Sequence, residues 1–395
     1  MTAEPAPFRF EPSAAQLEDL RSRLGATRIP VDDAAHDARF GITSDYLRAF
    51  VAYWLDEYDW SAEQEAINAL PNSRVTLDDQ PVHFVHVHGV GPAPMPLVLT
   101  HGWPWSFWDY RKVIGPLTDP GAHGGDARDA FDVVIPSLPG YVFSSPLRAS
   151  GVSARQAARL WDRLMRDVLG YDRYGAAGGD WGANISTLLG HEHADHVTGV
   201  YVTLPNFGAS LRNRFEPFRL DELGEEERTW YAAHYRNKLP DGQVYVPPNV
   251  ANFTRPHNEA YAGHDSPLAL AVKIIEARLR NGDTGGDVEG VFSREELVTN
   301  VMLYWLTGTW PSSHRLYWHS VRDRVPPVPG DGPLIPVPTG VGVFPAEVLY
   351  VPRAQVARDV DLRLWSYHEA GGHFAACEQP EAFVADVRTL FRDLR

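Results

Sequence analysis

One short segment, Ala177-Gly-Gly-Asp180-Trp-Gly-Ala, restricts the fold of this chain more than any other. It follows a strand-like run and precedes a helical pattern that begins near Asn184. A sharp turn from a strand into a helix needs small residues around its central position, because the strained backbone leaves no room for larger side chains. Gly178 and Gly182 meet this requirement. The segment therefore predicts an elbow that exposes the Asp180 carboxylate.

Short β-rich runs that end in Gly or Pro turns lie on both sides of this elbow, and helical patterns alternate with them. The strand-like runs are residues 82–87, 96–100, 132–135 and 199–203. The helical patterns are residues 153–169 and 182–191. Because parallel strands are joined by helical crossovers, this alternation predicts an α/β core with a mostly parallel sheet and helices on both faces.

The regions outside these strands have a different pattern. Residues 13–24 and 44–58 have amphipathic helical spacing, and the second is rich in aromatic side chains that need a packing surface. Between Phe207 and Pro326 the strand signal gives way to helical, aromatic-rich sequence, which includes residues 297–310. We therefore expect an N-terminal arm at residues 1–75, a core at 76–206 and 327–395, and a helical lid at 207–326.

Charge and hydropathy exclude two classes of partner. The formal net charge of −15 disfavours nucleic acid, because phosphate binding depends on clustered Lys and Arg. We find no signal peptide and no apolar stretch long enough to cross a bilayer, so we expect a cytoplasmic protein with no membrane partner. The single cysteine, Cys377, excludes an internal disulfide and fits a reducing compartment. A composition rich in Ala, Arg, Gly, Pro and Asp is typical of a GC-rich bacterial genome.

The histidine-rich segments lack metal-ligand spacing. His191-Glu-His193-Ala-Asp-His196 matches neither an H-E-x-x-H helix pair nor a zinc finger, and a solvated helix end is the simpler interpretation. His86 and His88 share one face of a strand without a cysteine or carboxylate beside them. We therefore expect no metal and no cofactor.

Asp180 occupies the elbow position that a serine holds in the G-x-S-x-G motif. A carboxylate in this position attacks an sp³ carbon and leaves an ester on the enzyme. The alternative is a glycine turn in which the aspartate caps a helix through hydrogen bonds to backbone N–H groups. The motif alone does not decide between these two interpretations.

Three other segments favour a nucleophile. His101-Gly-Trp103-Pro follows a strand, where the backbone N–H of Trp103 could form an oxyanion hole with that of Trp181. Val343-Phe-Pro-Ala-Glu347 ends a later strand with an acid, and Ala370-Gly-Gly-His373 places a histidine on a loop after the last strand. The chain order of nucleophile, acid and histidine is the order in the α/β-hydrolase fold.

At these motifs the sequence resembles the microsomal-type epoxide hydrolases, including their N-terminal region, over nearly the whole chain. The motifs that carry the resemblance are Leu20-Arg-Ser-Arg-Leu, Thr27-Arg-Ile-Pro, Tyr58-Asp-Trp, Phe84-Val-His-Val, His101-Gly-Trp-Pro, Pro136-Ser-Leu-Pro-Gly-Tyr, Gly178-Gly-Asp-Trp-Gly, Asp265-Ser-Pro-Leu, Asn300-Val-Met-Leu-Tyr-Trp, Val337-Pro-Thr-Gly, Phe344-Pro-Ala-Glu and Gly371-Gly-His-Phe-Ala-Ala. The resemblance implies an α/β-hydrolase core, a small-molecule epoxide and water as substrates, and a vicinal diol as product.

The resemblance also implies a role for each site residue. Asp180 is implied as nucleophile, His373 as the base that activates water, and Glu347 as the acid that orients His373. Tyr317, in His314-Arg-Leu-Tyr, is implied as a lid phenol that donates a hydrogen bond to the epoxide oxygen. A phenol suits this role because ring opening develops alkoxide charge. Without the resemblance, ordinary aromatic packing would be the simpler interpretation of Tyr317.

The family usually has a second lid tyrosine upstream of a Lys/Arg-Pro pair, and this chain departs from that pattern. Here the pair is Arg255-Pro256, and the two candidates that flank it are Tyr245 and Tyr261. The membrane-anchored members of the family carry an N-terminal apolar helix, which we do not find in this sequence.

Two other functions compete with epoxide hydrolysis. A haloalkane dehalogenase also uses an Asp nucleophile followed by Trp, but the halide it releases needs N–H donors, whereas an epoxide oxygen needs an acid such as Tyr317. A non-catalytic binding protein on the same scaffold would have lost a member of the triad, yet all three are present. A serine esterase is disfavoured because no serine occupies an elbow.

The aromatic-rich lid bears on the size of the substrate. Its aromatic side chains suggest a bulky or aryl epoxide unless they form a core instead; they are Tyr304, Trp305, Trp310 and Trp318. A homodimer is compatible with the sequence.

Overall fold

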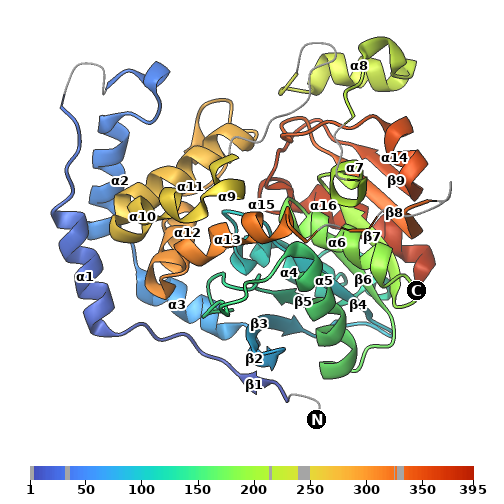
Figure 1. The fold of residues 1–395 in the computed structure, drawn as a ribbon, viewed down its shortest axis with the longest axis horizontal. Helices are drawn as coiled ribbons and strands as arrows, with labels where there is room; N and C mark the ends of the chain where they lie inside the picture. The colour runs from blue at the N-terminus through green and yellow to red at the C-terminus, as the bar shows by residue number, and fades with distance from the viewer. Residues whose placement is uncertain (1–3, 32–35, 213–215, 239–249, 324, 327–332) are drawn as a thin grey trace.

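Nine strands of the described residues form one sheet at the centre of the structure (Figure 1). The computed structural model describes residues 4–31, 36–212, 216–238, 250–323, 325–326 and 333–395. The order across the sheet is β1-β2-β3-β5-β4-β6-β7-β8-β9. These strands are β1 (Ala6–Pro7), β2 (Asn72–Leu77), β3 (Gln80–Val87), β4 (Met95–Thr100), β5 (Phe131–Pro136), β6 (Tyr174–Gly178), β7 (Val197–Val202), β8 (Ile335–Val343) and β9 (Val360–Tyr367).

The strands β4 to β9 run parallel to one another, whereas β1, β2 and β3 pair antiparallel. Every residue of β6, at the centre, is buried. A parallel strand that is buried on both faces needs covering helices on both sides. The predicted α/β core with a mostly parallel sheet is confirmed.

Helices cover both faces of the sheet. A Cβ added to Gly199 of β7 would meet Phe391 of α16 (Pro380–Phe391), whereas Val200, the next residue of β7, contacts Gly190 of α6 (Trp181–Glu192). Successive residues of a strand point to opposite faces, so α16 and α6 lie on opposite sides of the sheet. Helix α4 (Arg111–Thr118) packs beside α16, and α5 (Ala154–Arg163) packs beside α6.

The N-terminal arm belongs partly to the sheet and partly to the lid. Its strands β1 and β2 extend one edge of the sheet, so the arm is not a separate layer. Its helices α1 (Ala14–Gly25), α2 (Ser44–Asp56) and α3 (Trp60–Ala69) lie beside the lid (Figure 1). Gln16 Nε2 donates to Leu306 O at 2.9 Å, and the indole N–H of Trp54 donates to the sulfur of Met302 at 3.3 Å.

The lid lies between two neighbouring strands, β7 and β8. Its helices are α7 (Phe207–Arg212), α8 (Glu225–His234), α9 (Val250–Thr254), α10 (Pro256–Asp265), α11 (Pro267–Asn281), α12 (Arg294–Thr307) and α13 (Trp310–Ser320). Two more short helices, α14 (Arg353–Asp359) and α15 (Ala375–Glu378), follow in the C-terminal part of the core. No helix in the described part of the chain is long and apolar enough to span a membrane.

The helical pattern at residues 297–310 is divided in the structure. Helix α12 ends at Thr307, because Gly308 adopts a left-handed conformation with φ 62° and closes the helix as a C-cap. Trp310 then begins α13 in a new direction, with Pro311 in its first turn. This break sets the direction of α13, which carries Tyr317.

Candidate active site

The predicted elbow is present at the end of β6. Asp180 has a φ of +50°, which is rare for a residue with a side chain, and α6 begins at the next residue. A Cβ on Gly182 would lie 1.7 Å from the backbone oxygen of Thr100, and one on Gly178 would lie 2.5 Å from the same atom. The two glycines therefore allow β4, β6 and α6 to meet closely enough to present the Asp180 side chain.

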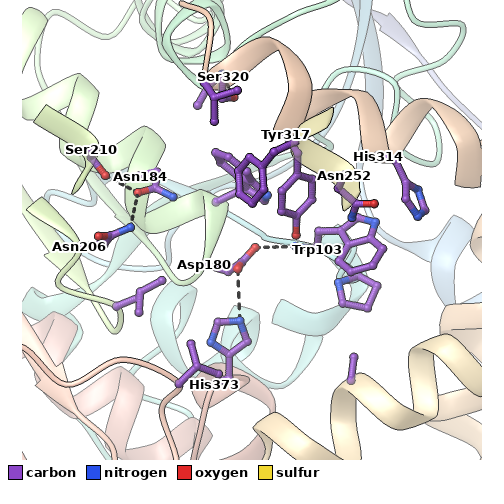
Figure 2. Close-up of a pocket in the computed structure, with 18 of the residues that line it drawn as sticks. Trp103, Asp180, Asn184, Asn206, Ser210, Asn252, His314, Tyr317, Ser320 and His373 are labelled. Atoms are coloured by element: carbon purple, nitrogen blue, oxygen red, sulfur yellow. Dashed lines mark hydrogen bonds and ion pairs between the residues drawn. The ribbon is translucent and has the colours of Figure 1, made fainter. Parts of the chain in front are cut away.

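The carboxylate of Asp180 is held from two sides (Figure 2). Its Oδ1 accepts a hydrogen bond from the backbone N–H of Trp103 at 2.8 Å. Its Oδ2 lies 3.3 Å from Nε2 of His373. The backbone N–H of Trp181 is the first of α6, and the first N–H groups of a helix have no partner inside it. The structure thus places both predicted oxyanion-hole residues beside Asp180.

His373 and Glu347 come from loops that follow two adjacent strands, β9 and β8. Nδ1 of His373 donates to Oε1 of Glu347 at 2.6 Å, and the backbone N–H of Val348 donates to the same oxygen, also at 2.6 Å. Both side chains are buried. This bond fixes the ring so that Nε2 faces Asp180. The three predicted triad residues therefore form one connected line.

The charges around His373 control its affinity for protons. Burial alone would lower the pKa of His373. The carboxylates of Glu347 and Asp180 have the larger, opposite effect and raise the pKa from 6.5 to about 10. With both carboxylates ionised, the imidazole is held in the protonated form at neutral pH.

Tyr317 lies on α13, across the cavity from His373, and its hydroxyl is directed toward Asp180 (Figure 2). Its ring is enclosed by three aromatic side chains with nearly perpendicular planes. The ring centroids are 4.9 Å from Trp181, 5.6 Å from Trp103 and 5.2 Å from Phe253. The aromatic enclosure orients the phenol, and Tyr317 lines the same cavity as Asp180 and His373.

Of the two candidates for the second lid phenol, the structure describes only Tyr261. Tyr245 lies outside the described residues. Tyr261 is 63% exposed on the outer side of α10 and does not line the cavity, so its hydroxyl is not directed at the Asp180 carboxylate. The geometry therefore gives no support to Tyr261.

A cavity of about 450 Å³ lies above Asp180, within the range of small-molecule sites. Its aromatic and apolar lining residues include Trp103, Pro104, Trp181, Leu204, Phe253, Tyr317, Val348 and Leu349, and polar residues such as Asn184, Asn252 and Lys273 line it as well. None of the four lid aromatics singled out in the sequence lines this cavity. Tyr304 and Trp310 are core residues instead, because the Tyr304 hydroxyl donates to Trp105 O and the Trp310 ring stacks on Trp103.

The lid also holds the histidine loop, which the sequence did not reveal. The backbone N–H of His373 donates to Asn281 O, at the end of lid helix α11, at 3.0 Å. The buried carboxyl of Glu378 accepts from Phe374 N at 2.8 Å and from Asp283 N at 2.7 Å. Burial raises the pKa of Glu378 to about 7. These contacts join segments distant in sequence, and no motif indicates them.

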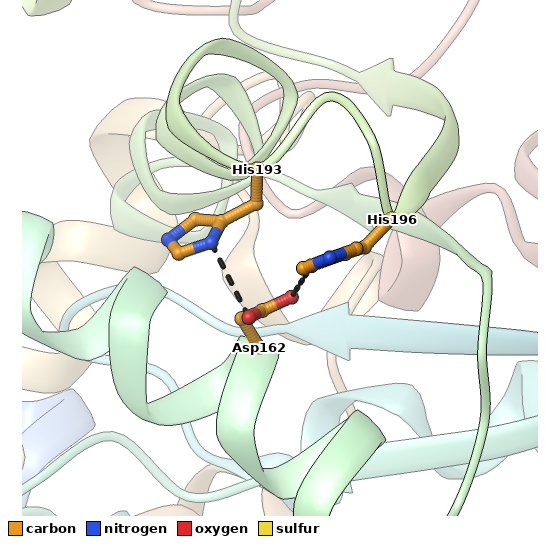
Figure 3. Close-up of side chains that lie close together, drawn as sticks. All are labelled: Asp162, His193 and His196. Atoms are coloured by element: carbon orange, nitrogen blue, oxygen red, sulfur yellow. Dashed lines mark hydrogen bonds and ion pairs between the residues drawn. The ribbon is translucent and has the colours of Figure 1, made fainter.

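The histidine-rich segment meets a carboxylate away from this cavity (Figure 3). Nδ1 of His196 lies 2.9 Å from Oδ1 of Asp162, and Nδ1 of His193 lies 3.3 Å from Oδ2. Tyr174 also donates to Asp162, and Arg166 Nη1 donates to Nε2 of His196 at 2.7 Å. The second ring nitrogen of His196 is therefore occupied by a cation. The arrangement ties the turn between α6 and β7 to α5.

The comparisons with known proteins agree with this geometry. Residues 5–110 match the family model "Epoxide hydrolase N terminus", and residues 95–243 match the model "alpha/beta hydrolase fold". The chain is 37% identical to a putative epoxide hydrolase of Stigmatella aurantiaca, over 98% of this chain and 85% of that protein. It is 34% identical to epoxide hydrolase 1 of Sus scrofa, over 97% of this chain and 87% of the relative.

A solved structure supports the same assignment. The epoxide hydrolase of Aspergillus niger superposes with a TM-score of 0.81 at 28% identity, covering 99% of this chain and 97% of that one. Similarity therefore extends over the arm, the core and the lid. The chain belongs to the epoxide hydrolase family.

Proposed function

We propose that this protein hydrolyses an epoxide to a vicinal diol through an ester on Asp180. The observation that carries the proposal is the position of the Asp180 carboxylate between the imidazole of His373 and the phenol of Tyr317 (Figure 2). A nucleophile, a base and an acid around one cavity are the groups that a two-step epoxide opening needs.

In the first step Oδ2 of Asp180 attacks a ring carbon and forms a C–O ester bond. The bond from that carbon to the epoxide oxygen breaks, and its electron pair stays on this oxygen, which takes a proton from the Tyr317 hydroxyl. Oδ1 remains the carbonyl oxygen of the ester, held by the N–H of Trp103.

Between the two steps the imidazolium of His373 returns a proton to the Tyr317 phenolate through solvent, so Tyr317 is neutral again and His373 becomes a free base. In the second step His373 removes a proton from a water molecule, and the resulting hydroxide attacks the ester carbonyl carbon. The Trp103 N–H stabilises the oxyanion that forms on Oδ1. Collapse of this intermediate breaks the ester bond. The departing oxygen takes the proton of the new carboxyl group, which releases the diol and restores the Asp180 carboxylate. Glu347 stabilises the imidazolium that His373 becomes.

The site favours an epoxide over a haloalkane as substrate. The Tyr317 hydroxyl is directed toward Asp180 and can protonate the epoxide oxygen, whereas the indole N–H of Trp103, a donor that a halide could use, already donates to Ser313 Oγ at 3.1 Å. The aromatic side chains around Asp180 and the cavity of about 450 Å³ support a bulky or aryl epoxide.

Diol formation from styrene oxide, followed by chromatography, tests the proposal. We expect turnover by the wild type and none by Asp180→Asn, which keeps the shape of the side chain but removes its nucleophilic charge. Bromide release from 1-bromobutane is measured beside it. Bromide release without diol formation would identify a dehalogenase instead, and neither product from a panel of aryl and alkyl epoxides and bromoalkanes would refute the proposal.

A further inference from the structure

Asn184 is a polar residue of the cavity that the proposed mechanism does not use. It lines the cavity from α6, four residues after Asp180. Asp180 directly precedes α6, so Asn184 lies one turn into the helix, about 6 Å along its axis. A group that binds Asn184 therefore lies close to the carboxylate that opens the epoxide.

Two neighbours fix the orientation of the Asn184 amide. Its Oδ1 accepts from Asn206 Nδ2 at 3.5 Å and also accepts from the Ser210 hydroxyl. Both donors belong to the segment that follows β7. Because its oxygen is held by these two donors, the amide presents its NH₂ group on the other side. Figure 2 shows this nitrogen directed toward the middle of the cavity.

The NH₂ group of Asn184 has no acceptor among the side chains and backbone groups that the structure describes. Apolar side chains, among them Leu188, Leu204 and Leu349, line the same cavity, as do polar ones such as Asn252 and Lys273. A donor without a protein acceptor, in a cavity that also has apolar lining, is typical of a group that sets the orientation and choice of a ligand. An unpaired donor becomes costly once a bound molecule displaces the water that solvates it.

We infer that Asn184 binds an acceptor oxygen of the substrate, with Asn206 and Ser210 as positioning residues. The substrate class is an epoxide that carries an ether, carbonyl or hydroxyl oxygen within a few bonds of the ring. This inference rests on the proposed epoxide hydrolysis. A site built to donate a hydrogen bond discriminates strongly against an analogue without the acceptor.

Two isosteric probes test the inference: phenyl glycidyl ether, and 4-phenyl-1,2-epoxybutane, in which a methylene replaces the ether oxygen. The ether oxygen also changes the intrinsic reactivity of the ring, so the informative quantity is the ratio of the two kcat/KM values in each protein. We expect Asn184→Leu to reduce this ratio about tenfold. The change should come mainly from a higher KM for the ether, because the contact is to a group that does not react.

Asn184→Asp keeps the size of the side chain and removes the NH₂ donor, so it tests the same contact if the leucine variant does not fold. Ser210→Ala should reduce the ratio by a smaller factor, because it loosens the amide without removing it. Asn258→Leu, which alters an exposed amide of α10 outside the cavity, should keep the wild-type ratio.

The outcomes separate the two proposals. Equal ratios in the wild type, Asn184→Leu and Asn184→Asp, with diol formed from both probes, would overturn the role of Asn184 and leave epoxide hydrolysis intact. No diol from either probe or from styrene oxide with the wild type would overturn both. A ratio that falls in Asn258→Leu as it does in the Asn184 variants would also contradict the inference.

Discussion

Nε2 of His373 lies 3.3 Å from Oδ2 of Asp180, so the proposed base and the proposed nucleophile share one electrostatic environment. The negative charge of Asp180 is one of the two that raise the pKa of His373 to about 10. Ester formation removes that charge. The pKa of His373 therefore falls between the first and second steps, and the imidazole can lose its proton when a base is required.

Asp180→Asn imitates the loss of charge, so we expect the pKa of His373 to fall below about 10 while the remaining carboxylate of Glu347 still raises it. A histidine whose pKa is raised by folding adds to the free energy of unfolding. For His373 this contribution is complete below pH 6.5, the ordinary pKa of histidine, and it is lost as the pH rises through about 10. NMR titration of the His373 ring proton measures the shift. Identical titration in both proteins would contradict the coupling.

His373→Gln should accumulate the intermediate, because only the second step needs a base. After mixing with an epoxide that the wild type converts, mass spectrometry should find one added substrate molecule on the peptide that contains Asp180. A variant that forms neither adduct nor diol from such an epoxide would contradict the assigned role.

Isotopic labelling tests the same ester in the wild type. In a single turnover in ¹⁸O-water, the label should enter the Asp180 carboxylate, and the first diol should contain unlabelled oxygen from the enzyme. Label in the diol from the first turnover onward would indicate direct attack by water, with Asp180 as a general base.

Glu347→Gln should keep the fold and slow hydrolysis of the ester about 100-fold or more, because a neutral amide does not stabilise the imidazolium. Ester formation should change much less. Rapid-quench measurement of both half-reactions separates these effects. Equal losses in the two steps would show that Glu347 does not act through the base.

Tyr317→Phe keeps the aromatic packing with Trp181 and Trp103 but removes the proton donor. We expect ester formation to slow about 100-fold, within the usual range for general acid catalysis. Single-turnover kinetics measure this step directly. An unchanged rate would remove Tyr317 from the mechanism.

Gly182→Ala should destabilise the fold on the order of 3 kcal/mol, because its Cβ would lie 1.7 Å from the backbone oxygen of Thr100. Gly224→Ala is the matched control, since a Cβ there meets no atom within 4 Å. Urea denaturation of the three proteins provides the comparison. Equal stability of the two variants would show that the elbow can relax.

The elbow and the line of site residues were predictable because short segments encode them. Gly178 and Gly182 reveal a close approach of backbones, and the order of Asp180, Glu347 and His373 follows from strand order. The orientation of lid residues was not predictable in this way. Whether a residue such as Tyr261 faces the cavity or solvent depends on how a whole helix docks, and no local pattern records that.

The contacts between lid and loop were hidden for a similar reason. His373 bonds to Asn281 O through its backbone, so any residue type at position 281 could accept this bond. The residues that line the cavity also come from many separate segments. Their grouping depends on tertiary packing and not on spacing along the chain.

The lid leaves the sheet after β7 and returns at the neighbouring parallel strand β8. A recombinant protein could therefore carry the lid of a relative without any change in strand order. The arm would have to be exchanged with it, because Gln16, Trp54 and Tyr58 bind residues of α12. In this fold, two blocks of sequence more than a hundred residues apart would have to be exchanged together to keep the contacts of the lid.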